Sequence, residues 1–152
     1  MKYLKVFAIM SILFFCVLLN AQYTEYKDFL ATAVDVDADE TVATSSRSIW
    51  VSRPGYSGVV SLICTFTRDA GTASTLDFYF MASHDGGTTW ENFDDITIEI
   101  PTNQAVYSGK IVREVKLVYV FGLTQLKLSK ITNNDGANGV TDCNVTLSQG
   151  VN

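Results

Sequence analysis

The feature that most constrains the fold is an alternation of apolar and polar side chains, which recurs in short runs from residue 30 to the C-terminus. Successive side chains of a β-strand point to opposite faces of a sheet, so each run is typical of a strand with one buried face. The clearest run spans residues 59–67. No run outside the N-terminal segment has the apolar period of an amphipathic helix. The pattern predicts an all-β chain, and in residues 59–67 the apolar face is Val60, Leu62, Cys64 and Phe66.

Clusters of Gly, Asn, Asp, Ser and Thr separate the runs, as expected for turns between strands. Residues 111–121 differ because they are almost continuously apolar, which predicts a strand covered on both sides. The spacing predicts about eight or nine strands in an antiparallel two-sheet β-sandwich, either a jelly roll or an immunoglobulin-like fold. The other predicted strands are residues 30–36, 47–53, 76–82, 96–100, 126–129 and 140–148, with a return strand that starts at 90–93.

Residues 1–21 have the composition of an export segment. Lys2 and Lys5 precede an apolar run, and Ala21 supplies a small residue for cleavage. The run is shorter than the roughly 20 residues that cross a bilayer comfortably. We interpret the segment as a secretory signal peptide; the alternative is a retained hydrophobic anchor, which would confine membrane contact to residues 1–21. Residues 22–152 have the length of one domain with a single core.

Charge and composition exclude several classes of function. The eleven Lys and Arg residues are scattered and the net charge is −5, so the chain lacks the basic patch with which proteins bind nucleic acid. Hydrophobic residues make up 47% of the chain and only two residues are proline, which excludes a disordered composition. We therefore expect a globular domain whose partner is not nucleic acid.

Residues 83–90 read Ser-His-Asp-Gly-Gly-Thr-Thr-Trp and resemble the Asp-box, the hairpin motif best known from sialidase propeller blades. Glycine permits positive φ, short polar side chains bond to the amides of the turn, and an indole closes over the hairpin. A propeller needs several blades, and this chain has one copy, so the resemblance implies a strand connector and transfers no catalytic residue. The structural positions are Ser83, Asp85, Gly87, Thr89 and Trp90.

Cys64 and Cys143 are the only cysteines beyond the N-terminal segment. Each occupies the apolar face of its predicted strand, so both are expected to point into the same core. An exported compartment permits a disulfide between them, which in the chain-entropy model stabilises the fold by roughly 4 kcal/mol. The alternative is two buried thiols that pack as small hydrophobic side chains.

The acidic run at residues 35–40 predicts Asp35, Asp37 and Asp39 on one face of a strand. We interpret them as a charged ladder that keeps an exposed edge strand from pairing with another chain. The alternative is a calcium site, although the run departs from an EF-hand loop at two required positions. The loop at 133–138 offers further oxygen atoms. No metal and no other cofactor is predicted.

No catalytic residue is predicted. His84 is the only histidine, and it lies within the 83–90 turn without a recognisable nucleophile partner. The carboxylates that follow this turn lack the spacing of a glycosidase pair. A small secreted hydrolase is kept as one alternative function.

Aromatic side chains are the remaining indication of binding. Tyr56 stands between Gly55 and Gly58 and is predicted in a loop. Together with Trp50 and Tyr107 it is a candidate for a flat surface that stacks on sugars or on a partner protein. The alternative is ordinary packing in the core or a hairpin. A secreted carbohydrate-binding module is the second alternative function.

Two longer segments, DFYFMASHDGGTTW and LTQLKLSKITNNDGANGVTDCNVTLS, together with the run of strands, resemble the small β-sandwich virion proteins of tailed phages. The resemblance implies an assembly role without chemistry. An export segment favours a secreted or cell-surface location instead, with a virion as the alternative. We predict a non-catalytic structural or interaction module that acts through loop and edge-strand contacts. Protein partners or self-assembly are expected, and glycans are a further class of partner.

Overall fold

The computed structural model describes residues 23–52, 56–68, 74–93, 96–100 and 110–151. These residues form strands and no helix, so the all-β prediction is confirmed; none of them belongs to an apolar helix long enough to cross a bilayer. The signal or anchor predicted at 1–21 lies outside the described residues.

The strands are β1 Tyr23–Asp28, β2 Val34–Val36, β3 Thr41–Ala43, β4 Ile49–Trp50, β5 Tyr56–Arg68, β6 Ser74–Ser83, β7 Glu91–Asn92, β8 Ile96–Ile100, β9 Lys110–Tyr119, β10 Gln125–Asn133 and β11 Val140–Val151.

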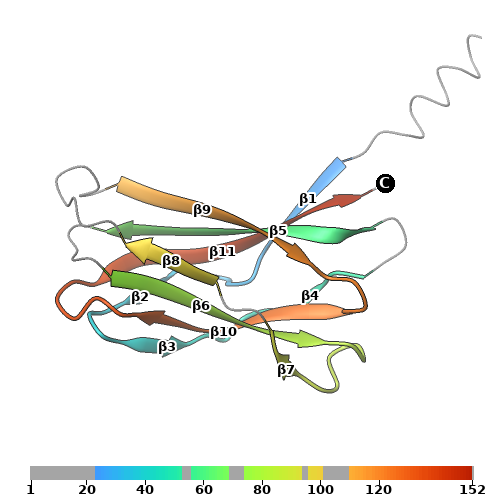
Figure 1. Ribbon diagram of the computed structural model, residues 1–152, viewed down its shortest axis with the longest axis horizontal. Helices are drawn as coiled ribbons and strands as arrows, with labels where there is room; N and C mark the ends of the chain where they lie inside the picture. The colour runs from blue at the N-terminus through green and yellow to red at the C-terminus, as the bar shows by residue number, and fades with distance from the viewer. Residues whose placement is uncertain (1–22, 53–55, 69–73, 94–95, 101–109, 152) are drawn as a thin grey trace, which may run out of the picture.

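The strands form two antiparallel sheets that face each other as two layers (Figure 1). One sheet has the order β1-β11-β5-β9, and β2 also pairs with β11. The other has the order β3-β10-β6-β7, with β4 beside β10 and β8 beside β6. The predicted two-sheet β-sandwich is therefore confirmed.

The strand pairing identifies the sandwich as a jelly roll. β1 and β2 share one neighbour, as do β3 and β4, and β7 and β8, so each couple occupies the place of one edge strand. The couple β1 and β2 pairs with β11, and the couple β3 and β4 pairs with β10. Further in, β5 pairs with β9, and β6 pairs with the couple β7 and β8. This nesting of hairpins, in which the chain crosses between the two sheets at each step except from β6 to β7 and β8, is the jelly-roll arrangement. It decides against the immunoglobulin-like alternative.

The interrupted edges explain why the structure has more strands than the predicted eight or nine. Residues 30–36 were predicted as one strand, but β1 ends at Asp28 and β2 begins at Val34. Phe29 and Leu30 are consecutive and both buried, which breaks the alternation of a strand. Residues 47–53 contribute only the short β4, and β3 is too polar to be recognised by its apolar pattern.

The core lies between the inner faces of the two sheets. From β5 it receives Val60, Leu62, Cys64 and Phe66, as the alternation predicts. Phe29 reaches across the gap and meets Phe80 of β6 edge to face, with ring centroids 5.6 Å apart. The largest fully buried apolar side chains are Phe29, Phe66, Phe78, Phe80, Leu62, Leu76, Leu126, Leu128, Ile131 and Leu147.

The four edges of the two sheets are unequal. Among the described residues, three edges consist of two short strands placed end to end, each strand two to six residues long. The fourth edge is β9, which runs for ten residues and pairs with β5 without a shift in register. Short and broken edges resist pairing with another chain, whereas a long regular edge invites it.

Candidate functional site

The outer face of β9 exposes a cluster of large apolar side chains. Among the described residues, five of the seven exposed large hydrophobic side chains lie on β9 or directly after it, with 49–74% of their surface accessible. Clusters of exposed apolar side chains on a soluble domain commonly mark an interaction surface. We call this group the β9 patch, and it consists of Ile111, Val115, Leu117, Tyr119 and Phe121.

The prediction that residues 111–121 are covered on both sides is wrong. Val112 and Val118 pack against the core, but the alternate residues face outward, and no described element lies over them. The run contains Arg113, Glu114 and Lys116, and charges inside an apolar strand are typical of a sheet edge. That signal was present in the sequence.

The end of the β9 patch is held in place by local packing. The rings of Tyr119 and Phe121 stack with centroids 6.5 Å apart and planes 18° from parallel. A Cβ atom on Gly58 would come within 2.0 Å of the Phe121 ring, so the ring rests directly on the β5 backbone. Val120 N–H also donates to the Gly58 carbonyl oxygen at 2.9 Å. These contacts order the aromatic pair although both rings are about three-quarters exposed.

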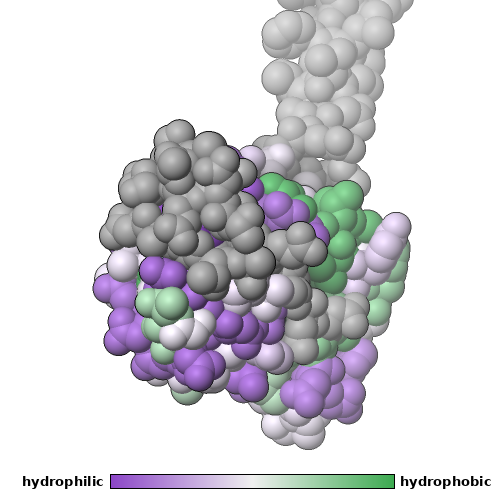
Figure 2. All heavy atoms as spheres, turned by 60° about the vertical axis from the view of Figure 1, so that its left-hand side comes forward, coloured by the Kyte–Doolittle hydropathy of each residue, from purple (hydrophilic) through white to green (hydrophobic). Residues whose placement is uncertain are grey.

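Small residues continue the outer face away from β9. In register, Leu117 lies opposite Ser61 of β5, Ser61 opposite Ser148 of β11, and Ser148 opposite Tyr26 of β1. Short hydroxyl side chains therefore separate the β9 patch from Tyr26, which is 64% exposed. Figure 2 shows hydrophobic residues gathered at the upper right of the described surface, whereas its lower part is mainly hydrophilic.

On the other sheet, lysine side chains lie over two of the aromatic rings. The Lys127 ammonium lies 4.2 Å from the Trp90 ring centroid, and the Lys130 ammonium lies 4.1 Å from that of Tyr79. Cations over these rings combine favourable cation–π contacts with a charged, solvated surface. The β9 patch is thus a property of one sheet and not of the whole surface.

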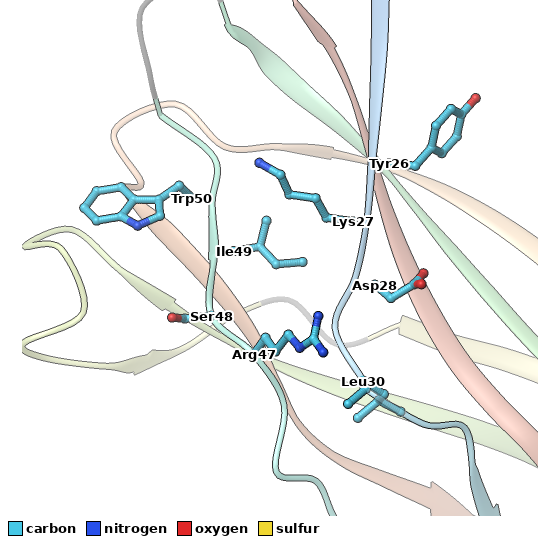
Figure 3. Close-up of a pocket in the computed structure, with 9 residues that line it drawn as sticks. Tyr26, Lys27, Asp28, Leu30, Arg47, Ser48, Ile49 and Trp50 are labelled. Carbon is cyan, nitrogen blue, oxygen red and sulfur yellow. The ribbon is translucent and has the colours of Figure 1, made fainter.

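A cleft of about 480 Å³ lies between β1 and the segment that contains β4. Figure 3 shows the Lys27 and Arg47 side chains reaching into the space between the two segments, while Tyr26 and Trp50 point away from it. The Lys27 ammonium is 3.0 Å from the Glu25 carboxylate, so one of the two cations is already paired. The lining contains one carboxylate, Asp28, and no histidine or cysteine.

The three aromatic candidates from the sequence do not come together as one described surface. Trp50 is 39% exposed and packs against the 83–90 turn, where a Cβ on Gly86 would lie 3.5 Å from the indole. Tyr56 is the first residue of β5, so its prediction as a loop residue is wrong; it pairs with Val151, which extends the sheet. The side chain of Tyr56, and Tyr107 as a whole, lie outside the described residues.

The 83–90 turn is closed by its own polar side chains. Ser83 Oγ accepts from Gly87 N–H at 2.8 Å and donates to Asp85 Oδ1 at 2.8 Å. Asp85 in turn accepts from the backbone N–H of Thr88 and Thr89, and Thr89 Oγ1 donates to Asp85 Oδ2 at 2.7 Å. Trp90 Nε1 donates to the Gly87 carbonyl oxygen at 3.0 Å. Gly86 and Gly87 have φ of 74° and 92°, which glycine adopts without strain.

The turn is also fastened to β10 and to the loop before it. Thr124 Oγ1 donates to the Ser83 carbonyl oxygen at 2.8 Å and accepts from Gly86 N–H at 3.0 Å. His84 Nδ1 lies 2.9 Å from the Gly122 carbonyl oxygen, and its N–H donates there. The only histidine is therefore committed to a structural bond, and the turn connects β6 to β7 as a rigid hairpin.

The stability contributed by Asp85 is expected to vanish only in strong acid. The Thr89 N–H, then the Thr89 and Ser83 hydroxyls, hold the pKa of the Asp85 carboxyl well below its usual range. A lowered folded-state pKa means that the stabilisation is present above the unfolded pKa of about 4 and is lost as the pH falls toward the folded value. An NMR titration of the Asp85 carboxyl carbon should therefore give a midpoint far below about 4.

Unfolding measurements on Asp85→Asn provide the control for this assignment. The stability difference between parent and variant should be constant above about pH 4 and should shrink below it. A midpoint at the usual aspartate value, or a difference that does not change in acid, would show that the turn does not hold the carboxylate as described.

Cys64 and Cys143 are both fully buried and are separate thiols in the structure. Cys64 lies opposite Val145 of β11, and Cys143 lies opposite Val34 of β2 across an irregularity in register. Burial raises the pKa of each thiol to about 12, so both stay protonated and unreactive at neutral pH. The disulfide between them stays a prediction.

The aspartate ladder predicted on one strand face is not formed. Only Asp35 lies in a strand, where its Oδ1 accepts from Asp142 N–H at 3.0 Å. Asp37 and Asp39 lie in the turn after β2, and Asp39 has φ of 54°. Among the described residues, no three His, Cys, Asp or Glu side chains gather as metal ligands would. The oxygen-rich 133–138 loop instead bonds to itself, with Asp135 Oδ1 accepting from two backbone N–H groups.

Comparisons with known proteins give no family: no family model matches the chain, and no curated protein matches it. Solved structures with some likeness include infectious bursal disease virus, Gx strain, at 7% identity and a TM-score of 0.48, over 87% of this chain and 32% of that one. The PRD1 vertex protein P5 has 10% identity and a TM-score of 0.44, and the match covers 86% of this chain and 95% of P5. A Bacillus endospore appendage that forms disulfide-linked pili has 14% identity and a TM-score of 0.30, and the match covers 87% of this chain and 88% of the appendage chain. The chain spans about a third of the length of the bursal disease virus chains.

Proposed function

We propose that this protein is a non-catalytic interaction module that binds another protein through the β9 patch. The observation that carries the proposal is the exposure of five large apolar side chains along one edge strand. Complete burial of such a side chain contributes about 1.5–3 kcal/mol. A few anchors of this kind supply most of the binding energy of a typical interface, and aromatic residues are common among them. Tyr119 and Phe121, held by their stacking, are suitable anchors.

The polar groups of the described residues support a structural role for the rest of the domain. Asp85 and His84 are engaged in the 83–90 turn, and the two thiols are buried and protonated. An acid–base mechanism needs titratable groups that converge on one open site. The cleft between β1 and β4 contains two cations and one carboxylate, Asp28, which already accepts from the Thr146 hydroxyl.

We further propose that the module is displayed on an exported surface or a virion-like particle. Residues 1–21 have the composition of an export segment, which supports the first location. The strand pattern that resembles phage virion proteins supports the second. In both places a compact domain with one adhesive edge serves assembly.

Hydroxyl-radical footprinting tests the proposed function without knowledge of the partner. The full chain is labelled in the assembly isolated from its native source and as a dilute purified protein, and oxidation is quantified by mass spectrometry. We expect oxidation of Tyr119 and Phe121 to fall about tenfold or more in the assembly, because a buried anchor is fully desolvated. Tyr79 and Met81 on the other sheet are the matched control and should keep their reactivity.

Equal reactivity of the β9 patch in both states would refute the proposed function. Protection confined to Trp50 and the cleft residues would do the same, and would favour the carbohydrate-binding alternative. Protection of the patch in the assembly supports the proposal, whichever protein provides it.

A further inference from the structure

The free edge of β9 is the best-formed pairing surface in the described part of the molecule. One edge of β9 pairs with β5 from Val59 to Arg68, and no described strand lies along the other edge. The remaining edges are interrupted, as described above. A strand that joins β9 would find backbone N–H and C=O groups over ten regular residues.

Symmetry leaves few ways for two copies of β9 to pair. Two antiparallel copies related by a two-fold axis place one residue opposite its own copy, and side chains on facing residues then share a face of the sheet. Only two positions of the axis bring nine residues of each strand into register: Glu114, which pairs residues 110–118 with 118–110, and Val115, which pairs residues 111–119 with 119–111. All other positions pair fewer residues.

Charge decides between the two positions. An axis at Glu114 places that carboxylate opposite the partner's Glu114, and like charges directly opposite are destabilising. It also sets Lys116 opposite the partner's Val112. An axis at Val115 instead places Glu114 opposite the partner's Lys116, and the reverse, so that two ion pairs form across the axis.

The axis at Val115 also matches the apolar residues. Val115 meets the partner's Val115, Val112 meets the partner's Val118, and Ile111 meets the partner's Tyr119. Aromatic and β-branched side chains form favourable cross-strand pairs of this kind. Arg113 lies opposite the partner's Leu117, where its aliphatic stem can cover the leucine while the guanidinium stays in solvent.

We propose that a second copy of this chain pairs antiparallel with the free edge of β9 about an axis at Val115. This inference goes beyond the proposed function, because pairing through the edge sets the two β9 patches side by side and leaves their outer faces open to another partner. The first sheet then continues across the axis from β9 to the partner's β9. Within one copy the Lys116 ammonium already lies 3.5 Å from the Glu114 carboxylate, with both side chains nearly half exposed. Pairing joins two such couples into a cluster of alternating charge, and networks of this kind are stronger than isolated surface pairs.

Cysteine cross-linking of the full chain tests the register. Val115→Cys places two thiols opposite each other on the axis, within the reach of a disulfide, so mild oxidation should give covalent dimer at about ten times the yield of the parent chain. The parent, with its buried Cys64 and Cys143, supplies the background. Leu117→Cys is the matched control, because the two copies of residue 117 are offset by about 13 Å along the strands, beyond that reach.

Charge reversal tests the ion pairs. Glu114→Lys and Lys116→Glu should each weaken dimerisation about tenfold in sedimentation equilibrium, because each creates two like-charge contacts. The double variant restores opposite charges on every pair and should return the dissociation constant to within about twofold of the parent. Thermal unfolding of each variant at high dilution verifies that the monomer itself stays folded.

A parent chain that is monomeric at about 100 μM would overturn the inference. It would also fall if Leu117→Cys cross-linked as well as Val115→Cys, or if the double charge variant remained as weak as the single ones. Each of these results leaves the proposed function intact when footprinting shows the patch protected in the native assembly. Loss of that protection removes the proposed function and leaves the cross-linking result to decide the pairing.

Discussion

Replacing Phe29 with alanine is expected to lower the free energy of unfolding by about 4 kcal/mol. The Phe29 ring is fully buried between the sheets and contacts Phe80 edge to face. Its backbone joins both layers, since Phe29 N–H donates to the Val145 carbonyl oxygen and the Phe29 carbonyl oxygen accepts from Arg47 N–H. The well-packed surroundings cannot collapse into the space left by the ring, so a cavity remains.

Urea unfolding followed by tryptophan fluorescence measures this effect. Phe121→Ala is the matched control, because it removes the same side chain from a position that is 74% exposed. That variant should lose less than about 1 kcal/mol at concentrations where copies do not associate. Equal losses in the two variants would mean that Phe29 does not link the two sheets.

Replacing Asn133 with alanine is expected to lower the free energy of unfolding by about 3 kcal/mol. Asn133 is fully buried at the end of β10. Its Nδ2 donates to the carbonyl oxygens of Asp37 and Asn138 at 3.1 and 2.9 Å, and its Oδ1 accepts from Asp135 N–H at 3.0 Å. The amide therefore ties the turn after β2 to the loop before β11. Alanine leaves these buried backbone groups without their partner, which costs more than the bonds themselves contribute.

The neighbouring residue supplies the control for this prediction. Asn134 Nδ2 donates to Thr75 Oγ1 and Asp77 Oδ2 at 2.8 Å in exposed positions. Water replaces such partners readily, so Asn134→Ala should lose less than about 1 kcal/mol. If Asn134→Ala proved the more damaging of the two, the buried amide would not be the tie between the two loops.

The fold was predictable from sequence because alternation is a local property. β5 and β6 show it over most of their length, and β10 shows it up to the register shift after Leu128. A buried face then fixes which side chains enter the core. The breaks in the edges were not predictable. β1 ends where Phe29 and Leu30 both turn inward, and this depends on contacts with β6 and β11 that lie far away in sequence.

The candidate site was the least predictable part. The charges within residues 111–121 indicate a sheet edge, but the long-range pairing with β5 decides which face of the strand stays in water. Residue type and neighbouring glycines identify candidate aromatic residues but do not determine their exposure. Exposure in fact follows strand order, which places Tyr119 and Phe121 at the surface.

The inequality of the sheet edges has a consequence for stoichiometry. Within its described residues each copy offers one uninterrupted edge, and two-fold pairing uses that edge in both copies at once. Contacts of this self-complementary type close on themselves, whereas head-to-tail contacts propagate into rings or filaments. Growth through β9 therefore stops at two, and a larger particle would recruit whole pairs through some other surface, with an even number of copies.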